Sequence, residues 1–227
     1  MSITTVANVP GFSWSYSVLK NYETCPRRYY AYNVARDVTE PESEAIKHGH
    51  AVHAAFEARV KKGTPLPLGM GMHEPILAKL ADAPGEIHTE QKLGLSSSFA
   101  PTGFHGANVW FRIVLDYANV REDGTATVID YKTGRPSEDM TQMELSAATL
   151  FAHDKRVQRV KAALLFVEHE QIERAEFVRS QTTEIWSHVL PRVRQVIEAR
   201  QRQDYPPRPG GLCRRYCAVI SCPFHGR

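Results

Sequence analysis

The 227 residues have the length of one domain with insertions, or of one domain with an appendage. Apolar residues make up 42% and charged residues 23%, which excludes a fibrous or intrinsically disordered chain. The longest wholly apolar run, Ala162 to Val167, is far too short to cross a bilayer, and residues 1–15 lack the pattern of a secretory signal. We therefore expect a cytosolic (cytoplasmic) protein without a membrane partner.

The net charge of +3 is unevenly distributed along the chain. Residues 192–215 contain seven arginines against two acidic residues, whereas the rest of the chain is slightly acidic. A basic segment on a near-neutral body suits a polyanion such as nucleic acid. A solvated helix face explains the same charges, so both interpretations stay open at this point.

The first third of the chain is predicted to be helical after a loose lead-in at residues 1–12. The stretch 15–34 predicts a helix that begins at a serine cap, Ser15 or Ser17, and breaks at Cys25-Pro26. Apolar residues near helical spacing predict a helix over 44–62. A loop rich in proline and glycine at 63–72 and a shorter helix over 73–81 follow.

The middle of the chain changes to strands. Residues with β-branched and aromatic side chains predict strands over 87–95, 109–120 and 125–132, with a loop at 96–106 and a turn at 121–124. A helix over 138–154, a strand over 160–168 and its hairpin partner over 172–179 come next. The last predicted helix, over 182–203, contains Pro191, which either kinks it or lies in its first turns. Helices that flank a set of strands predict a layered α/β or α+β domain.

The strongest local motif is Val-Ile-Asp-Tyr-Lys-Thr-Gly at residues 128–134. In a strand, Asp130 and Lys132 project to one side while Ile129 and Tyr131 face the other. A surface ion pair gives the same pattern. However, Asp116 ends an apolar run on the preceding strand, and antiparallel pairing brings it to the same end of the sheet as Asp130. Two close carboxylates attract a hard divalent cation, magnesium or manganese.

The helix over 44–62 carries His53 and Glu57 at positions i and i+4, on one face. An imidazole that joins two carboxylates favours manganese, and Glu57 is placed to orient His53. A packed or surface histidine is the simpler interpretation of His53 taken alone.

In this order, the elements resemble the RecB-like branch of the PD-(D/E)XK nuclease superfamily. The residues that match are the helix motif Gly49-x-x-x-His53-x-x-x-Glu57, Asp116 after an apolar strand, the motif Asp130-Tyr131-Lys132-Thr133-Gly134, and Gln142 at the start of the next helix. The resemblance implies an α/β restriction-endonuclease-like core, in which helices flank a central mixed sheet.

The resemblance also implies roles for these residues. It assigns a divalent metal, Mg²⁺ or Mn²⁺, to His53, Asp116, Asp130 and the backbone carbonyl of Tyr131. Lys132 would position or activate the attacking water and stabilise charge in the transition state, and Gln142 would orient the substrate.

The four cysteines are also unevenly placed: Cys25 stands alone, whereas Cys213, Cys217 and Cys222 lie within ten residues. In a reducing compartment such a cluster is more often a metal site than a disulfide framework. Three cysteines need a fourth ligand, for which Cys25 and His225 are both candidates. The pattern resembles iron–sulfur-stapled nucleases, including the CRISPR-associated four-cysteine nucleases, the AddB nuclease domain and phage exonucleases. That resemblance implies a 4Fe–4S cluster on the four cysteines, with Zn²⁺ as the alternative.

Together these features predict a divalent-metal-dependent DNA nuclease, an exonuclease on single-stranded DNA or DNA ends. The predicted division is a flexible lead-in at 1–12, a nuclease domain at 13–205, and a C-terminal cysteine segment at 206–227 that completes a metal staple with Cys25. No Gly-x4-Gly-Lys-Ser/Thr loop occurs, so we expect a separate helicase, recombinase or integrase partner. The resemblance places the activity in recombination, repair, phage replication or CRISPR adaptation. The alternative is a non-catalytic DNA-binding subunit that retains the fold and binds through residues 192–215.

Overall fold

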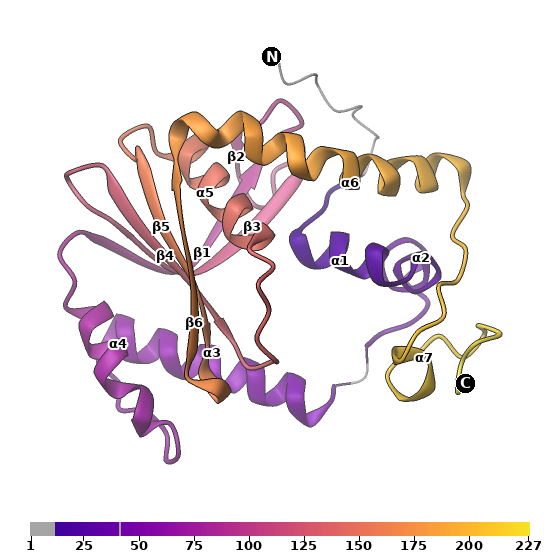
Figure 1. The fold of residues 1–227 in the computed structure, drawn as a ribbon, viewed down its shortest axis with the longest axis horizontal. Helices are drawn as coiled ribbons and strands as arrows, with labels where there is room; N and C mark the ends of the chain where they lie inside the picture. Colours follow the sequence, from indigo (N-terminus) through magenta and orange to yellow (C-terminus); the bar gives the residue numbers. More distant parts are fainter. Residues whose placement is uncertain (1–11, 41) are drawn as a thin grey trace.

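A six-stranded mixed sheet forms the centre of the protein in a computed structural model, which describes residues 12–40 and 42–227 (Figure 1). The strand order is β2-β1-β3-β4-β5-β6; β4 and β5 pair in parallel, and the other neighbouring strands of this sheet are antiparallel. The mixed sheet expected from the sequence is confirmed. The predicted lead-in, residues 1–12, lies outside the described residues except for Phe12. The strands are β1 (Glu86–Leu95), β2 (Pro101–Thr102), β3 (Phe111–Val120), β4 (Thr125–Lys132), β5 (Arg159–Phe166) and β6 (Gln171–Val178).

Helices cover both faces of this sheet (Figure 1). On one face lie α3 (Glu44–Lys62) and α4 (Glu74–Ala81), and on the other lie α5 (Thr141–His153) and α6 (Thr182–Arg202). Because β4 and β5 are parallel, the chain must cross between them, and α5 forms that crossover. The first helix, α1 (Tyr16–Thr24), lies beside α6. It is followed by α2 (Pro26–Tyr29) and a π-helical turn (Tyr30–Ala35), and the one-turn helix α7 (Leu212–Arg215) lies near the C-terminus. Short 3₁₀ turns lie at Gly71–His73, Val167–His169 and Arg179–Gln181.

Local chemistry explains where the predicted helices begin and end. Of the two candidate caps for α1, Ser15 is the one used, because its side chain accepts a hydrogen bond from the backbone N–H of Val18. The break at Cys25 is confirmed, and Pro26 starts α2. Proline is tolerated at the first position of a helix because the N–H that it lacks would have no acceptor within the helix. The chain leaves α3 at Gly63, whose φ of 67° is left-handed.

Two hydrophobic cores lie on the two faces of the sheet. The larger joins the sheet to α5, α6 and α1, and it contains the buried indoles of Trp14 and Trp110, whose ring centres are 5.3 Å apart. The smaller core joins α3 to β3 and β4, where Phe56 packs edge-on to Tyr131 at 4.9 Å. His53 lies three residues before Phe56 on α3. Burial of Phe56 therefore holds His53 against the ends of β3 and β4.

The structure corrects two sequence predictions, decides one that was left open, and adds a helix. The predicted loop at 96–106 contains the two-residue strand β2. Pro191 lies in the interior of α6, not in its first turns. The helix predicted from 138 begins at Thr141, because the carboxylate of Asp139 accepts a hydrogen bond from the Thr141 N–H at 3.1 Å and forms a turn. The C-terminal segment contains α7, which was not predicted.

None of the helices in the described part of the chain is both long and apolar enough to cross a membrane.

Candidate active site

A groove of about 1120 Å³ runs past the ends of β3 and β4. The side chains predicted to act together come from α3, β3, β4 and α5, and the groove is the place where these elements meet. All five of them line it: His53, Asp116, Asp130, Lys132 and Gln142.

The pairing of β3 with β4 brings the two aspartates together. These strands are antiparallel with Tyr117 opposite Ile129, so the next step in register sets Asp116 beside Asp130. Both carboxylates are buried, with 8% and 5% of their residue surface exposed. Asp116 Oδ2 also accepts a hydrogen bond from the backbone N–H of Tyr131 at 2.8 Å. The register therefore agrees with the prediction that antiparallel strands bring these carboxylates together, although Asp116 lies in the middle of β3.

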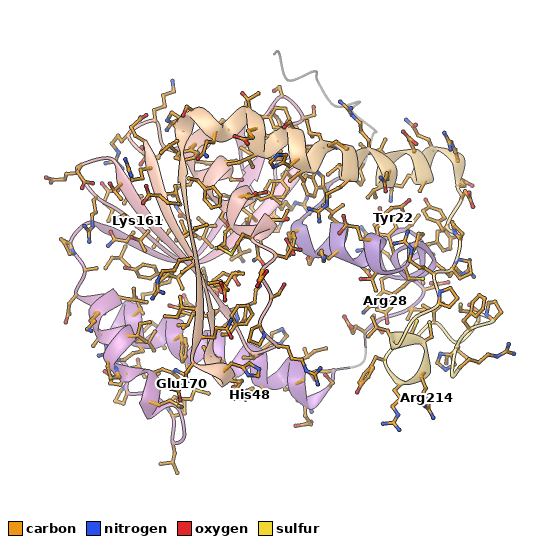
Figure 2. All side chains as sticks on the ribbon, in the orientation of Figure 1. Tyr22, Arg28, His48, Lys161, Glu170 and Arg214 are labelled. Carbon is orange, nitrogen blue, oxygen red and sulfur yellow. The ribbon has the colours of Figure 1, made fainter. Side chains whose placement is uncertain are left out.

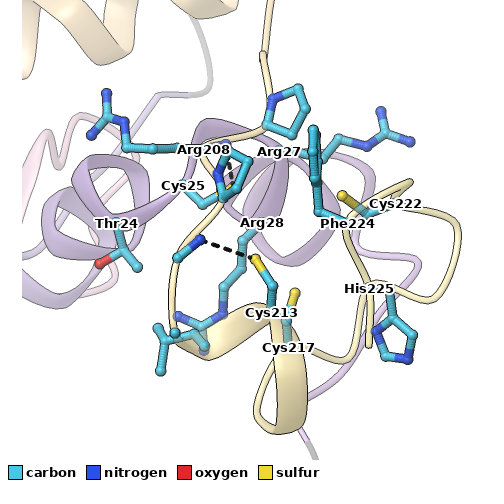
Figure 3. A pocket seen from close by; sticks show the side chains of 15 residues that line it. Thr24, Cys25, Arg27, Arg28, Arg208, Cys213, Cys217, Cys222, Phe224 and His225 are labelled. Carbon is cyan, nitrogen blue, oxygen red and sulfur yellow. Dashed lines mark hydrogen bonds between the residues drawn. The ribbon is translucent and has the colours of Figure 1, made fainter. Parts of the chain in front are cut away.

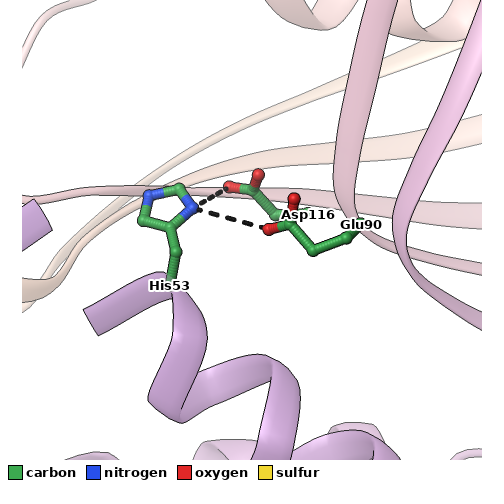
Figure 4. A group of neighbouring side chains, drawn as sticks. All are labelled: His53, Glu90 and Asp116. Atoms are coloured by element: carbon green, nitrogen blue, oxygen red, sulfur yellow. Dashed lines mark ion pairs between the residues drawn. The ribbon is translucent and has the colours of Figure 1, made fainter. Parts of the chain in front are cut away.

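His53 and Asp116 form a tight cluster with a third residue, Glu90 of β1 (Figure 4). His53 Nδ1 lies 3.4 Å from Asp116 Oδ2 and 3.9 Å from Glu90 Oε1. One nitrogen or oxygen from each residue lies within 4.8 Å of the other two, and no other group of three or more histidine, cysteine, aspartate or glutamate residues does so in the described ranges. The nitrogen and oxygen atoms of this cluster are suitable ligands for one divalent cation.

Sequence reasoning missed Glu90. A lone glutamate within a predicted strand carries no spacing signal, and only its strand's pairing with the Asp116 strand points to it. Glu90 has a φ of 50°, in the left-handed region that non-glycine residues seldom adopt. On either side of it β1 changes face: Leu93 packs in the larger core and Ile87 against the smaller one. This local distortion places the Glu90 carboxylate beside His53.

The second part of the site is a closed triangle of side chains from β4 and α5. Lys132 Nζ lies 2.7 Å from Asp130 Oδ2 and donates a hydrogen bond of 2.7 Å to Gln142 Oε1. Gln142 in turn donates through Nε2 to Asp130 Oδ1. Asp130 and Lys132 therefore project to one side of β4, as alternation in a strand predicts. The Asp130 carboxylate is held by Lys132 and Gln142 and lies outside the tight cluster of His53, Glu90 and Asp116.

The pKa values of this site reflect an accumulation of negative charge. Burial raises the pKa of Asp130 to about 6; the Lys132 ammonium opposes that rise and the Asp116 carboxylate adds to it. Burial, followed by repulsion from Asp116, raises the pKa of Glu90. A hydrogen bond with the Asp116 carboxylate raises the pKa of His53 against the opposing effect of burial. A cation in the site would relieve these charges.

Glu57 and Tyr131, for which roles beside a metal are expected, make two other contacts. Glu57, expected to orient His53, places its carboxylate 3.3 Å from Lys61 Nζ, and Glu90 occupies the position beside His53. The backbone carbonyl of Tyr131, expected to face a metal, accepts a hydrogen bond of 3.0 Å from His53 Nε2.

A second cavity, of about 220 Å³, lies between residues 24–28 and residues 207–225. It is lined by all four cysteines, Cys25, Cys213, Cys217 and Cys222, and by His225 (Figure 3). All four are free thiols. Cys25 Sγ accepts a hydrogen bond of 3.3 Å from the backbone N–H of Arg208, and Cys213 Sγ accepts one of 3.4 Å from that of Gly210.

The arginines of residues 192–215 do not act as one free basic face. Arg192 forms a two-pronged ion pair with Glu23, at 2.6 and 3.0 Å, and Arg202 lies 3.8 Å from Glu198. Arg214 is exposed and lies at the opposite end of the molecule from Lys161 (Figure 2). Part of this charge therefore holds α6 against α1, which weakens the interpretation of the segment as a continuous site for a polyanion.

Comparison with known proteins identifies the family. The sequence matches the PD-(D/E)XK nuclease superfamily over residues 13–92 and 70–223. The chain belongs to this superfamily, and membership implies a metal-dependent nuclease. A search of curated proteins finds no match. Among solved structures the chain is similar to the crystal structure of SSO0001, with 12% identity, a TM-score of 0.41, and coverage of 98% of this chain and 90% of that one. A likeness at this level carries no argument about function.

Proposed function

We propose that the protein is a divalent-metal-dependent deoxyribonuclease of the RecB-like branch, an exonuclease on single-stranded DNA or DNA ends. The observation that carries this proposal is that His53 and Asp116, two of the three residues in the cluster with Glu90, meet the triangle of Asp130, Lys132 and Gln142 in one groove. Hydrolysis of a phosphodiester requires a nucleophile at neutral pH and stabilisation of charge on the phosphate oxygens. The groove holds residues suited to both tasks.

The donor atoms suit a hard or borderline divalent cation. Carboxylate oxygens favour Mg²⁺ and Mn²⁺, and the imidazole of His53 makes Mn²⁺ acceptable. We propose that His53, Asp116 and Asp130 hold the metal and that Glu90 joins them. A cation bound there would polarise the scissile phosphate and lower the pKa of a bound water.

The triangle supplies the positive charge that the reaction needs. Because Asp130 and Gln142 fix the Lys132 ammonium at 2.7 Å from each, it loses little freedom when substrate enters. We propose that Lys132 orients the attacking water and stabilises charge on the phosphate, and that Gln142 orients the substrate. The exposed Lys161 of β5 lies on the wall of another pocket and serves as a matched control.

The same proposal includes a metal staple that joins a nuclease domain, 13–205, to a C-terminal segment, 206–227. The four free cysteines surround one cavity, and two of them accept backbone hydrogen bonds of the kind that stabilise thiolates. Four cysteines around one cavity can hold a 4Fe–4S cluster or a single Zn²⁺. We propose the cluster, on the resemblance to iron–sulfur-stapled nucleases, and keep Zn²⁺ as the alternative.

A nuclease assay on two forms of one DNA strand tests the proposed activity. Linear end-labelled single strands and covalently closed single-stranded circles of the same sequence are incubated with Mn²⁺. We expect the linear strand to be degraded and the circle to survive, and Lys132→Ala to lose activity while Lys161→Ala keeps it. Cleavage of the circle would show that the protein is an endonuclease and not an exonuclease. DNA binding without any cleavage would favour the non-catalytic subunit.

A further inference from the structure

The groove extends beyond the carboxylates along β3, toward Arg112 and Phe104. Both of these residues line the same groove as Asp116 and Asp130. Arg112 and Asp116 are four residues apart in one strand, so their side chains share a face and lie about 13 Å apart along it. That span exceeds one nucleotide of a single strand. A substrate held at Arg112 therefore contacts it through a nucleotide other than the reacting one.

Two cations surround the aromatic ring of Phe104. The Arg112 guanidinium carbon lies 5.8 Å from the ring centre, and Lys92 Nζ lies 5.9 Å from it. Within the described ranges, neither cation forms an ion pair, and the buried Nε of Arg112 has no hydrogen-bond acceptor. Arg112 lines the groove, so an anion that enters the groove would meet a guanidinium that no carboxylate neutralises among the residues that the structure describes.

The loop that carries Phe104 is held in place by its neighbours. Thr102 Oγ1 donates a hydrogen bond of 2.6 Å to Asn108 Oδ1, and Gly106 N–H donates one of 2.8 Å to the carbonyl of Gly103. The loop packs closely on β1 at Gly94, where an added Cβ would lie 3.0 Å from the Gly103 carbonyl oxygen. The His105 ring also packs edge-on to Phe104 at 4.9 Å. Phe104 is thus held at the groove before any ligand binds.

We propose that Phe104, Arg112 and Lys92 form a nucleotide subsite for single-stranded DNA, in which an unpaired base stacks on Phe104 while its phosphate binds Arg112 and Lys92. An aromatic ring beside guanidinium and ammonium groups is the chemistry by which proteins hold unpaired bases and their backbone. Bases within a duplex are stacked on both faces and cannot reach the ring without unstacking. The subsite rests on the proposed nuclease function and narrows its substrate to a strand that is single at this position.

Binding without metal tests the subsite separately from catalysis. Fluorescein-labelled oligothymidylate is titrated with protein in EDTA and followed by anisotropy. We expect Phe104→Ala to weaken binding about tenfold, a loss of about 1.4 kcal/mol, and Phe104→Tyr to retain it. Arg112→Ala should reduce the slope of log K against log salt by about 0.7, the value for one phosphate contact on a single strand. Arg174→Ala, an exposed charge on β6, should leave that slope unchanged.

A scan with abasic nucleotides separates stacking from a merely structural role of Phe104. One base is removed at successive positions of the oligonucleotide, and each substrate is measured with wild type and with Phe104→Ala. If a base stacks on Phe104, removing the base at one position of the oligonucleotide should weaken binding to the wild type. The same removal should leave binding to Phe104→Ala unchanged. If the loss of affinity from the missing base adds to the loss from Phe104→Ala at every position, the subsite is overturned. This holds even for a protein that binds and cleaves DNA. Failure of the wild type both to bind and to cleave any DNA would instead refute the proposed function and the subsite with it.

Discussion

Asp130→Asn should make the metal-free protein more stable at alkaline pH. Burial raises the pKa of this carboxyl from 3.8 to about 6, so the folded state resists its ionisation. The shift of about two units corresponds to a destabilisation of about 3 kcal/mol at pH 8, because each unit is worth about 1.4 kcal/mol. A raised carboxyl pKa favours the folded state below pH 3.8, and this contribution is lost as pH rises through 6. The asparagine avoids the loss while keeping the size of the side chain.

Thermal unfolding in EDTA at two pH values measures this effect. For a chain of this length, about 3 kcal/mol raises the melting temperature by about 6–12 °C at pH 8. At pH 4.5 much of the carboxyl is protonated in the folded protein, and the advantage of the variant should fall to about 1 kcal/mol. With Mn²⁺ at a hundredfold excess over its Kd, the wild type should gain about 2.7 kcal/mol and the variant much less.

A variant that is less stable than the wild type at both pH values would refute this reasoning. Such a result would mean that the ion pair of Asp130 with Lys132, at 2.7 Å, outweighs the burial of the carboxylate. An equal Mn²⁺ response in the two proteins would remove Asp130 from the proposed ligand set.

Three further predictions concern the other parts of the molecule. Glu90→Gln should weaken Mn²⁺ binding about 10- to 100-fold in calorimetry, whereas Glu57→Gln, whose parent carboxylate lies by Lys61, should leave it unchanged. Protein purified without oxygen should be brown and lose its colour and stability in Cys213→Ser; a colourless, zinc-loaded wild type would contradict the cluster. Gly85→Ala should cost about 2 kcal/mol or more in denaturant unfolding, because Gly85 has a φ of 129° and an added Cβ would lie 2.7 Å from the Val120 carbonyl oxygen. An unchanged unfolding midpoint would show that this turn can rearrange.

Local sequence was sufficient for the elements that carry the site. The bounds of α3 and β4 match their predicted ranges, because apolar periodicity, the turn at 121–124 and Gly63 are all encoded within a few residues. The proximity of Asp116 to Asp130 was also predictable, since a short turn between antiparallel strands leaves few possible registers. Weak local signals failed at β2 and at the start of α5, where short-range hydrogen bonds decide the structure.

The sequence by itself therefore determined the order of the helices and strands other than β2 and α7, the paired aspartates, and the family motif with its lysine. Only the tertiary structure decided that Glu90 stands beside His53 and that Gln142 bonds both Asp130 and Lys132. The physical reason is that these contacts join segments far apart in the chain. Their distances depend on how whole helices pack on the sheet and on one left-handed residue in β1, neither of which has a local pattern in the sequence.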